Sequence, residues 1–409
     1  MSHDENAFGD LMRSLREQRG LSLKALGALT MYAKTHLYYI EQGERTPTTE
    51  LATRLDDALQ ADGALLAAAG HAALRRLLTT AAQESTELVR WVNEEPADGI
   101  AQDALARELS SIARGYVHRP PLPLLSDLLS VRKKIARQLE LARRLHRRRE
   151  LALMGAVAVQ LLGELTDDVA GNSEAAMRHV LAGELLAQEA AHPGLRAWVA
   201  GTKALIAEWS PQPRTALGII DDAAGWAPPG DYRVRLFALQ ARCAGRLGDA
   251  HLARSAAART VAAAEEAGDT RDEVTAFGGA LTFPHPKMAY YLGCAYRSIG
   301  DHQDAERWSM DAINQYTAGP AEQRSYGDEA LARVEVGLSR IARNELEGAG
   351  EILSPVLELP TEQRITCIME GMSTVVGALR EHRHAQAPVA RDLREIIRGY
   401  TARSAVALR

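Results

Sequence analysis

Hydrogen-bonding side chains are clustered near the N-terminus of the chain, within one short stretch. The stretch contains Lys34, Thr35, His36, Tyr38 and Tyr39. Leu37 and Ile40 lie among them, three residues apart, and this spacing predicts the buried side of a short helix. The polar side chains must then face outward near the start of that helix. Donors, acceptors and aromatic edges in this arrangement suit contacts with base edges in the major groove of DNA.

An apolar pattern just before this stretch predicts a second helix that braces the first. Three leucines recur at helical spacing, namely Leu23, Leu26 and Leu29, and a short break follows at residues 30–32. Two helices joined by such a break form a helix-turn-helix, in which the second helix lies in the major groove. Gly43 follows where a left-handed turn must end that helix, and Pro47 stops any continuation.

Residues 8–62 resemble the Xre/Cro-type helix-turn-helix family of DNA-binding proteins. The matching residues are Leu26, Leu37, Ile40, Glu41, Gln42, Gly43, Glu44, Arg45 and Pro47. The resemblance implies a structural ion pair between Arg16 and Glu41, since a buried charge is tolerated only with a partner. We expect DNA contacts from the five polar residues above, and a phosphate contact from Arg45, just beyond the helix.

Three positions depart from the pattern of that family. Leu23 stands where the family often has a phosphate-binding Gln, Gly27 replaces the usual Ala, and Ala33 replaces the Ser that opens the recognition helix. The side chains at Leu23 and Ala33 therefore cannot make the two phosphate contacts that the family makes there. An alternative interpretation is that residues 8–62 form a small helical bundle that uses the same packing for a protein contact.

The distribution of charge gives modest support to the DNA interpretation. Between Leu11 and Pro47, six basic and three acidic residues give a net charge of +3, whereas the whole chain carries −5. A weakly basic surface predicts moderate, salt-dependent affinity for DNA. With a pI of about 6.2, nucleic-acid binding must be a local property of the chain.

The composition predicts an all-α protein of more than one domain. Of the 409 residues, 46% are hydrophobic but only 5% are aromatic, and Ala and Leu fill most apolar positions. We expect a helix-turn-helix domain over residues 1–70, a helical connector over 71–122, and a repeat domain for dimerisation and sensing over 123–409. The connector ends in the sequence RPPLP, which cannot continue a helix.

The third region is similar to proteins with tetratricopeptide repeats. Its best hairpin, residues 288–320, has a turn at Gly300 and small residues on the returning helix, namely Ala305, Ser309 and Ala312. The same template fits two further segments, with turns at Gly248 and Asn344. The resemblance implies a solenoid of degenerate helical hairpins. The whole chain resembles actinobacterial Xre regulators with helical-repeat sensor domains, and more distantly the peptide-sensing regulators of Gram-positive bacteria.

The largest inserted segment, residues 276–286, has paired glycines and two prolines, which predict a loop. In solenoids, inserted loops and the concave face are common partner sites. Adjacent positions on a helix point about 100° apart, so at most one of Tyr290 and Tyr291 is expected to be fully buried. We therefore predict a site for a peptide or small-molecule effector, with the candidate residues Phe283, Tyr290, Tyr291, Asn172 and Asn314.

A strongly basic stretch follows the proline-rich segment. Its members are Arg132, Lys133, Lys134, Arg137, Arg143, Arg144, Arg147, Arg148 and Arg149. One interpretation is a solvated helix face that keeps the protein soluble. The other is a contact for DNA phosphates or for an anionic effector. The sequence leaves both open.

The motifs of common active sites are missing from the sequence. It contains no Gly-rich phosphate loop, no H-E-x-x-H and no G-x-S-x-G, so we expect no enzyme, no cofactor and no metal. Cys243, Cys294 and Cys367 are far apart and are predicted to be buried small residues. The acidic start and the polar residues within the longest apolar stretch, residues 151–165, predict a cytoplasmic protein without a membrane span.

Together these patterns predict a sequence-specific, DNA-binding transcriptional regulator. It would act as a homodimer on a double-stranded DNA operator, because a two-fold dimer matches two half-sites. The alternative is a protein-interaction scaffold whose repeats bind a partner and whose N-terminal domain has lost DNA binding.

Overall fold

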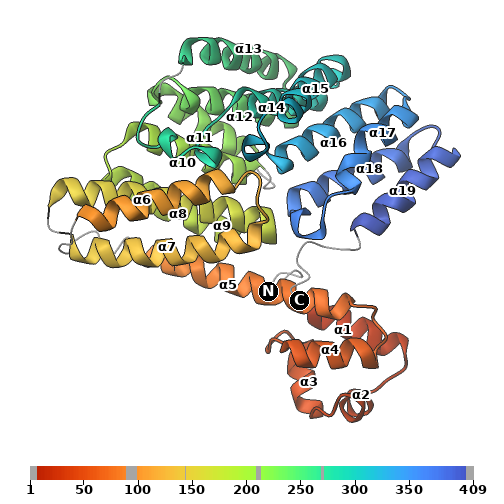
Figure 1. Cartoon of the computed structure of the whole chain (residues 1–409). Helices are drawn as coiled ribbons and strands as arrows, with labels where there is room; N and C mark the ends of the chain where they lie inside the picture. The colour runs from red at the N-terminus through yellow and green to blue at the C-terminus, as the bar shows by residue number, and fades with distance from the viewer. Residues whose placement is uncertain (1–6, 89–98, 143, 209–212, 269–270, 402–409) are drawn as a thin grey trace. The chain divides into compact units, whose positions relative to one another are not determined.

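The computed structural model describes residues 7–88, 99–142, 144–208, 213–268 and 271–401. Over these ranges the protein is all-α, as its composition predicted, with helices joined by turns and no strand (Figure 1). The chain divides into two compact units, with the boundary between Thr80 and Ala81. In the described ranges, no helix is both long enough and apolar enough to span a bilayer.

The first unit contains α1 (Ala7–Gln18), α2 (Leu23–Thr30), α3 (Lys34–Glu41), α4 (Thr49–Ala58) and the first part of α5 (Ala64–Leu88). Apolar residues from all of these helices meet in one core, which includes Met12, Leu26, Leu37, Ile40, Leu51, Leu55 and Leu65. Helices of eight to twelve residues are marginal on their own in water. Burial of this apolar surface, at roughly 25 cal/mol per Å², stabilises them.

The turn between α2 and α3 is tight. Met31 adopts a left-handed conformation, with φ of 62°, and its backbone N–H donates to the carbonyl oxygen of Gly27. The carbonyl oxygen of Tyr32 then approaches Gly27 so closely that a Cβ there would lie 2.6 Å away. Glycine at this position is therefore a requirement of the turn. At the far end of α3, Gly43 has φ of 74°, which confirms the predicted left-handed turn.

Leu29 does not belong to the core, although it continues the spacing of the other two leucines. It is 60% exposed, whereas Thr30 is buried and donates from its hydroxyl to the carbonyl oxygen of Leu26 at 2.9 Å. A helix turns by about 100° per residue, so the fourth residue after Leu26 lies nearer to its inward face than the third. The outward position of Leu29 follows from this geometry.

The second unit is a series of helices and short 3₁₀ turns (Figure 1). Its described elements are α6 (Gly99–Gly115), α7 (Pro121–Leu141), α8 (Leu145–Ala170), α9 (Ser173–Glu189), α10 (Pro193–Glu208), α11 (Pro213–Trp226), α12 (Asp231–Arg246), α13 (Ala250–Ala267), η2 (Thr275–Phe277), η3 (Gly279–Leu281), α14 (His285–Ser298), α15 (His302–Ala318), η4 (Ala321–Gln323), α16 (Tyr326–Ala342), α17 (Leu346–Leu357), η5 (Thr361–Gln363), α18 (Thr366–Glu381) and α19 (Pro388–Thr401).

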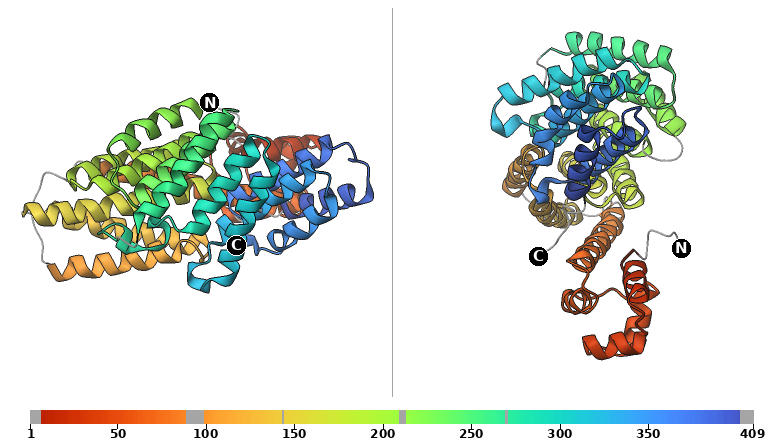
Figure 2. Two further views of the ribbon diagram at one scale, coloured as in Figure 1. Left: turned by 90° about the horizontal axis from the view of Figure 1, so that it is seen from above. Right: turned by 90° about the vertical axis from the view of Figure 1, so that its right-hand side faces the viewer.

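Consecutive helices of this unit pack as hairpins. The pairs are α8 with α9, α10 with α11, α12 with α13, α14 with α15, and α16 with α17. The first helices of successive hairpins also pack on one another, since α12 contacts α10 and α14, and α14 contacts α16. Figure 2 shows these helices side by side in chain order, from yellow-green to blue. This repeat-like packing fits the predicted series of helical hairpins.

Small residues allow the helices of one hairpin to approach closely. Gly293 on α14 faces Ser309 on α15, and a Cβ at Gly293 would overlap the Ser309 hydroxyl. Ala305 and Ala312 on the returning helix are fully buried, as the sequence predicted. Close packing of this kind holds paired helices together through many small dispersion contacts.

The proline-rich segment interrupts the helices but does not separate the two units. α6 ends at Gly115 and α7 begins at Pro121, so Pro121 and Pro123 lie in the first turn of α7. Proline is tolerated there because the first N–H groups of a helix have no intrahelical partner. α6 packs against α7 and α8. Residues 99–122, which we expected in a connector, therefore belong to the second unit.

The inserted segment at residues 276–286 is a loop with short 3₁₀ turns up to the start of α14 at His285, as its composition predicted, and it is packed against the protein. Phe277, at the end of η2, is buried. Two side chains of α6 bind the backbone of this segment: Ser110 Oγ donates to the carbonyl oxygen of Phe277 at 3.0 Å, and Arg114 Nη2 donates to that of Ala276 at 3.4 Å. The segment thus joins α6 to the helical hairpins.

Candidate nucleic-acid interface

Helix α3 presents polar and aromatic side chains on its outward side. Lys34 and Thr35 are exposed, and Tyr38 and Tyr39 retain 47% and 41% of their surface exposed. The two apolar residues among them are buried, as their spacing predicted. Tyrosine combines a large apolar ring with a hydroxyl and is enriched at binding surfaces. The outward side of α3 therefore has the composition of a contact surface.

His36 lies on the flank of this surface and is half-buried. Its ring stacks on Tyr32, with centroids 5.6 Å apart, and its Nδ1 lies 3.2 Å from Nη1 of Arg45. The guanidinium of Arg45 also lies 5.7 Å from the centroid of the Tyr39 ring. Arg45, which we expect to contact a phosphate, is exposed and is held along the flank of α3 by these two neighbours.

Glu41, at the end of α3, is only 2% exposed and is bound by two arginines of α1. Arg16 Nε donates to Oε1 at 2.6 Å and Arg16 Nη2 to Oε2 at 3.2 Å, while Arg13 Nη2 donates to the backbone carbonyl of Glu41 at 3.2 Å. The hydrogen bond with Glu41 raises the pKa of Arg16. Arg16 Nη1 also donates to the carbonyl oxygen of Leu21 at 2.9 Å. The ion pair implied by the resemblance is present, and it joins α3 to α1.

Leu23 and Ala33, which replace the family's phosphate-binding side chains, are both apolar. Leu23 is half-buried and packs against the core of the first unit. Ala33 precedes α3 and supplies no side-chain cap, whereas Ser22 caps α2 by accepting a hydrogen bond from the Ala25 N–H at 3.2 Å. Neither Leu23 nor Ala33 has a side chain that can donate a hydrogen bond to a phosphate.

The tyrosines predicted to border an effector site are both buried. Tyr290 is 5% exposed, Tyr291 4% and Phe283 3%. The expectation that at most one tyrosine could be fully buried was wrong because α14 is covered from several directions, by α12, α13, α15 and α16. Both Phe283 and Tyr290 lie edge-on to the Tyr291 ring, and the Arg242 guanidinium lies 4.4 Å from its centroid. These aromatic residues form a core and leave no open site.

The two predicted amide side chains lie elsewhere. Asn172 caps α9, where its Oδ1 accepts a hydrogen bond from the Ala175 N–H at 3.0 Å. Asn314 is exposed on α15. Neither residue lines either of the two grooves described next.

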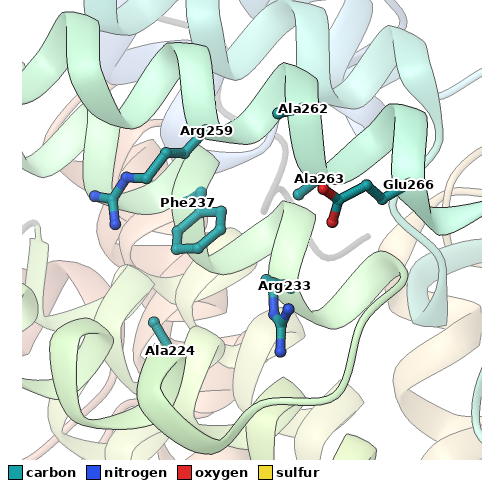
Figure 3. Close-up of a pocket in the computed structure, with 7 residues that line it drawn as sticks. All are labelled: Ala224, Arg233, Phe237, Arg259, Ala262, Ala263 and Glu266. Atoms are coloured by element: carbon teal, nitrogen blue, oxygen red, sulfur yellow. The ribbon is translucent and has the colours of Figure 1, made fainter.

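One groove, of about 380 Å³, lies between α11, α12 and α13 (Figure 3). Arg233 and Arg259 lie on opposite sides of Phe237, and the Glu266 carboxylate points into the same space. The Arg259 guanidinium lies 4.6 Å from the centroid of the Phe237 ring, and its Nη2 donates to Gln240. The groove offers two cations, one carboxylate and an aromatic face beside small alanines.

A second groove, of about 510 Å³, lies between α9, α10 and α11. Trp226 lines it, is 38% exposed, and has the Arg196 guanidinium 4.8 Å from its ring centroid. Leu181 and Leu185 on α9 are 44% and 49% exposed, and helical spacing places them on the side of α9 that borders the groove. The charged lining residues are Glu184, Arg196, Lys203 and Asp222.

The residues of these grooves gave little signal in the sequence. Arg233, Arg259 and Arg196 occupy ordinary positions of amphipathic helices, and the grooves form only where three helices meet. Trp226 was the one detectable sign, since a tryptophan at the end of a helix in an aromatic-poor chain is unusual.

The basic stretch at residues 132–149 fits neither of its two interpretations completely. Arg132 is buried and donates to the Ala81 carbonyl oxygen and to Glu84. Lys134 pairs with Glu108 at 2.7 Å, and Arg148 pairs with Glu189 at 3.5 Å. Besides Lys134, the exposed cations are Lys133, Arg137, Arg144 and Arg149, and Arg143 lies outside the described residues. Part of the stretch therefore joins helices, and part remains available to solvent or to an anion.

The cysteines have the inert surroundings that the sequence predicted. Cys243 and Cys294 are buried and Cys367 is half-buried. Burial raises the pKa of all three thiols, that of Cys243 to about 12. Protonated thiols are poor nucleophiles and poor metal ligands. Across the described ranges, no group of three His, Cys, Asp or Glu side chains could hold a metal ion.

Comparison with protein families matches residues 7–69 to a family described as a helix-turn-helix domain. These residues comprise α1 to α4 and the start of α5. The first unit is thus a helix-turn-helix domain, the fold in which a recognition helix is placed on DNA. A search of curated proteins found no similar sequence.

Proposed function

We propose that this protein is a sequence-specific, DNA-binding transcriptional regulator of the Xre/Cro type, with α3 as its recognition helix. The observation that carries the proposal is the exposed row of Lys34, Thr35, Tyr38 and Tyr39 on a helix-turn-helix domain. Side chains at these positions are available for base edges once the helix lies in the major groove. Arg45 supplies a phosphate contact from the flank.

The second unit is a degenerate tetratricopeptide-repeat domain in this proposal. Its helices pack as successive hairpins, and three hairpins turn at the residues that the repeat template indicated, Gly248, Gly300 and Asn344. Small residues lie where the helices of the best hairpin approach most closely. Repeat domains of this type present extended surfaces to partners.

The protein acts as a homodimer in this proposal, because two recognition helices about 34 Å apart match half-sites one turn of DNA apart. The surface around the second groove supports a contact between copies. It carries the exposed apolar side chains Leu181, Leu185 and Trp226, together with two cations and two carboxylates. A two-fold interface pairs a surface with itself, so equal numbers of opposite charges can be complementary there.

A peptide or small-molecule effector would regulate the dimer by binding in the groove between α11, α12 and α13. Its two arginines and its aromatic face suit a ligand with both an anionic and an apolar part. Coupling of roughly 1 to 3 kcal/mol between effector and operator would change DNA affinity about 5- to 150-fold. The protein would act in the cytoplasm and catalyse no reaction.

Selection of bound fragments from genomic DNA by the purified full-length protein tests this proposal, with and without cell extract. We expect enrichment of one sequence with two half-sites separated by about 10 base pairs. The double variant Lys34→Ala/Tyr39→Ala serves as the control and should enrich nothing. If the unaltered protein enriches no sequence, a protein-interaction scaffold becomes the better interpretation. Leu23 and Ala33, which replace two phosphate-binding side chains, favour that alternative.

A further inference from the structure

Four side chains form a row along the flank of α3 with His36 inside it. The His36 ring lies nearly parallel to that of Tyr32, at an interplanar angle of 23°, and the Arg54 guanidinium lies 5.9 Å from the Tyr32 centroid. On its other side, His36 Nδ1 lies 3.2 Å from Arg45 Nη1. The imidazole is thus held between an aromatic ring and a guanidinium.

The contact with Arg45 fixes the neutral tautomer of His36. A guanidinium carries only donors, so Nδ1 must accept this hydrogen bond. In a neutral imidazole the proton then lies on Nε2, which becomes a donor. Within the described part of the chain, no residue accepts a hydrogen bond from this Nε2. The donor is therefore available to a partner outside the chain.

The other polar groups of α3 also act mainly as donors. Lys34 and Arg45 can only donate, and the hydroxyls of the exposed threonine and tyrosines can donate or accept. The helix has no Asn, Gln or Asp, and its single Glu, Glu41, is buried against Arg16. The exposed carboxylate of Glu44 lies beyond the end of the helix. The first two turns of α3 thus lack the amide and carboxylate side chains that most often read adenine N6 or cytosine N4.

We propose that α3 selects guanine in each half-site, and that Lys34 and His36, which point to different sides of the helix, each donate to N7 of a separate guanine. In the major groove guanine presents two acceptors side by side, whereas adenine presents an acceptor and a donor, cytosine a donor, and thymine one acceptor beside a methyl group. A donor that binds N7 lies beside the O6 acceptor in guanine but beside the N6 amino donor in adenine, which repels it, so such a donor favours guanine. This inference rests on the proposed function, because it applies only where α3 lies in the major groove.

The test uses the full-length protein and an operator selected from a random DNA pool by repeated binding. Guanines of the selected half-sites are then replaced one at a time by 7-deazaguanine, which pairs normally but lacks the N7 acceptor. Replacement of a contacted guanine is expected to weaken binding roughly 10- to 100-fold in a gel-shift titration. Replacement of guanines outside the half-sites is the matched control and should change affinity little.

A variant assigns the contact to His36. His36→Phe retains a ring that can stack on Tyr32 but removes the Nε2 donor. At the guanine that His36 contacts, the unaltered protein should bind the normal operator more tightly than the 7-deazaguanine operator. For the His36→Phe variant, the ratio of these two affinities should fall to near one. Thr53→Ala, at an exposed position of α4, should leave that ratio unchanged. The melting temperature of each variant shows whether the domain remains folded.

The outcomes separate this inference from the function on which it rests. If no sequence is enriched, DNA binding itself fails. If an operator is enriched but 7-deazaguanine leaves affinity unchanged at every half-site position, DNA binding stands and guanine selection is overturned. If the His36→Phe variant folds and keeps the full affinity ratio at every guanine, the role of His36 is overturned. The measurement with 7-deazaguanine uses the unaltered protein, so it decides the main question even if the variant does not fold.

Discussion

Arg16 of α1 and Glu41 of α3 are joined by two hydrogen bonds, of 2.6 Å and 3.2 Å, at a carboxylate that water barely reaches. α3 has only eight residues, and a helix of this length does not hold its own position in water. The exposed residues of α3 precede Glu41 by only a few positions. The orientation of the surface that we assign to DNA therefore depends on a buried charge pair at the C-terminal end of the same helix.

Removal of the carboxylate should destabilise the first unit. We expect Glu41→Ala to lower its unfolding free energy by about 3 to 5 kcal/mol, because Arg16 would remain as a largely buried charge without its partner. Thermal unfolding of a fragment containing residues 1–88 measures this. Glu44→Ala, at an exposed position, should change stability by less than about 0.5 kcal/mol. Equal melting temperatures for the two variants would mean that the ion pair contributes nothing to stability.

Shortening the exposed side chains of α3 should affect DNA binding and not the fold. We expect Lys34→Ala and Tyr39→Ala each to weaken binding to the selected operator by about 1 to 3 kcal/mol. Gel-shift titration and melting temperatures measured side by side check both parts of this statement. An operator affinity that survives the double change would show that another surface reads the DNA.

Arg45 should contribute in a different way, because a phosphate contact carries no sequence information. Arg45→Ala should lower affinity for operator and unrelated DNA alike and reduce the slope of log affinity against log salt by about 1. Titrations at several salt concentrations on both DNAs measure this. Lys24→Ala, on α2, gives a comparison at another exposed cation. A loss confined to the operator would instead show that Arg45 contributes to sequence reading, directly at a base edge or through its contact with His36.

Asp168 should make the second unit more stable at acidic pH. It lies where α8 meets α6 and α18: Tyr116 Oη donates to its Oδ2 at 2.8 Å, and Cys367 Sγ lies 3.9 Å from its Oδ1. Burial raises the pKa of this carboxyl to about 7 from 3.8. The folded state thus binds one more proton than the unfolded state between about pH 4 and 7, and stability falls as the pH rises through this window.

Asp168→Asn isolates this effect, since the amide keeps an oxygen that can accept from Tyr116. Relative to the unaltered protein, the variant should gain stability as the pH rises from 4 to 7, by up to about 4 kcal/mol at about 1.4 kcal/mol per pKa unit. Urea unfolding at several pH values provides the comparison. A constant difference across that range would refute the assigned pKa.

Two glycines of the second unit should respond oppositely to alanine. A Cβ at Gly279 would overlap the carbonyl oxygen of Ala113 on α6, and φ there is 53°. Gly279→Ala should therefore cost more than the roughly 1 to 2 kcal/mol of a left-handed residue alone. Gly350, within α17, has open space around it, and Gly350→Ala should stabilise by up to about 1 kcal/mol. Urea unfolding of both variants tests the contact of α6 with the inserted segment.

Local patterns of the sequence predicted the helix-turn-helix well because its geometry is set by neighbours in the chain. The buried sides of α2 and α3, the turn at Gly43 and the hairpin turn at Gly300 all lie within a few residues of the pattern that indicates them. The pattern wrongly grouped Leu29 with the buried Leu26. Positions three and four residues after Leu26 point about 100° apart, and Thr30, not Leu29, faces the core.

Features that depend on distant parts of the chain could not be predicted in this way. Tyr290 and Tyr291 are both buried because four other helices surround α14, and a periodicity argument considers one helix at a time. The contact between His36 and Arg45 depends on side-chain conformations nine residues apart. Each of the two grooves forms where three helices meet, so the pattern of a single helix predicts neither of them, although Trp226 is a local sign of the second.

The contacts of Ser110 and Arg114 with the inserted segment limit how this chain could exchange parts with other proteins. More than 160 positions separate these α6 residues from the backbone that they bind. A genetic crossover between α6 and the later helices would give a hybrid in which the segment around Phe277 loses its contacts with Ser110 and Arg114. A crossover upstream of Gly99 would carry α6 along with the hairpins. New pairings of DNA-binding and repeat parts should therefore arise from breakpoints before that residue.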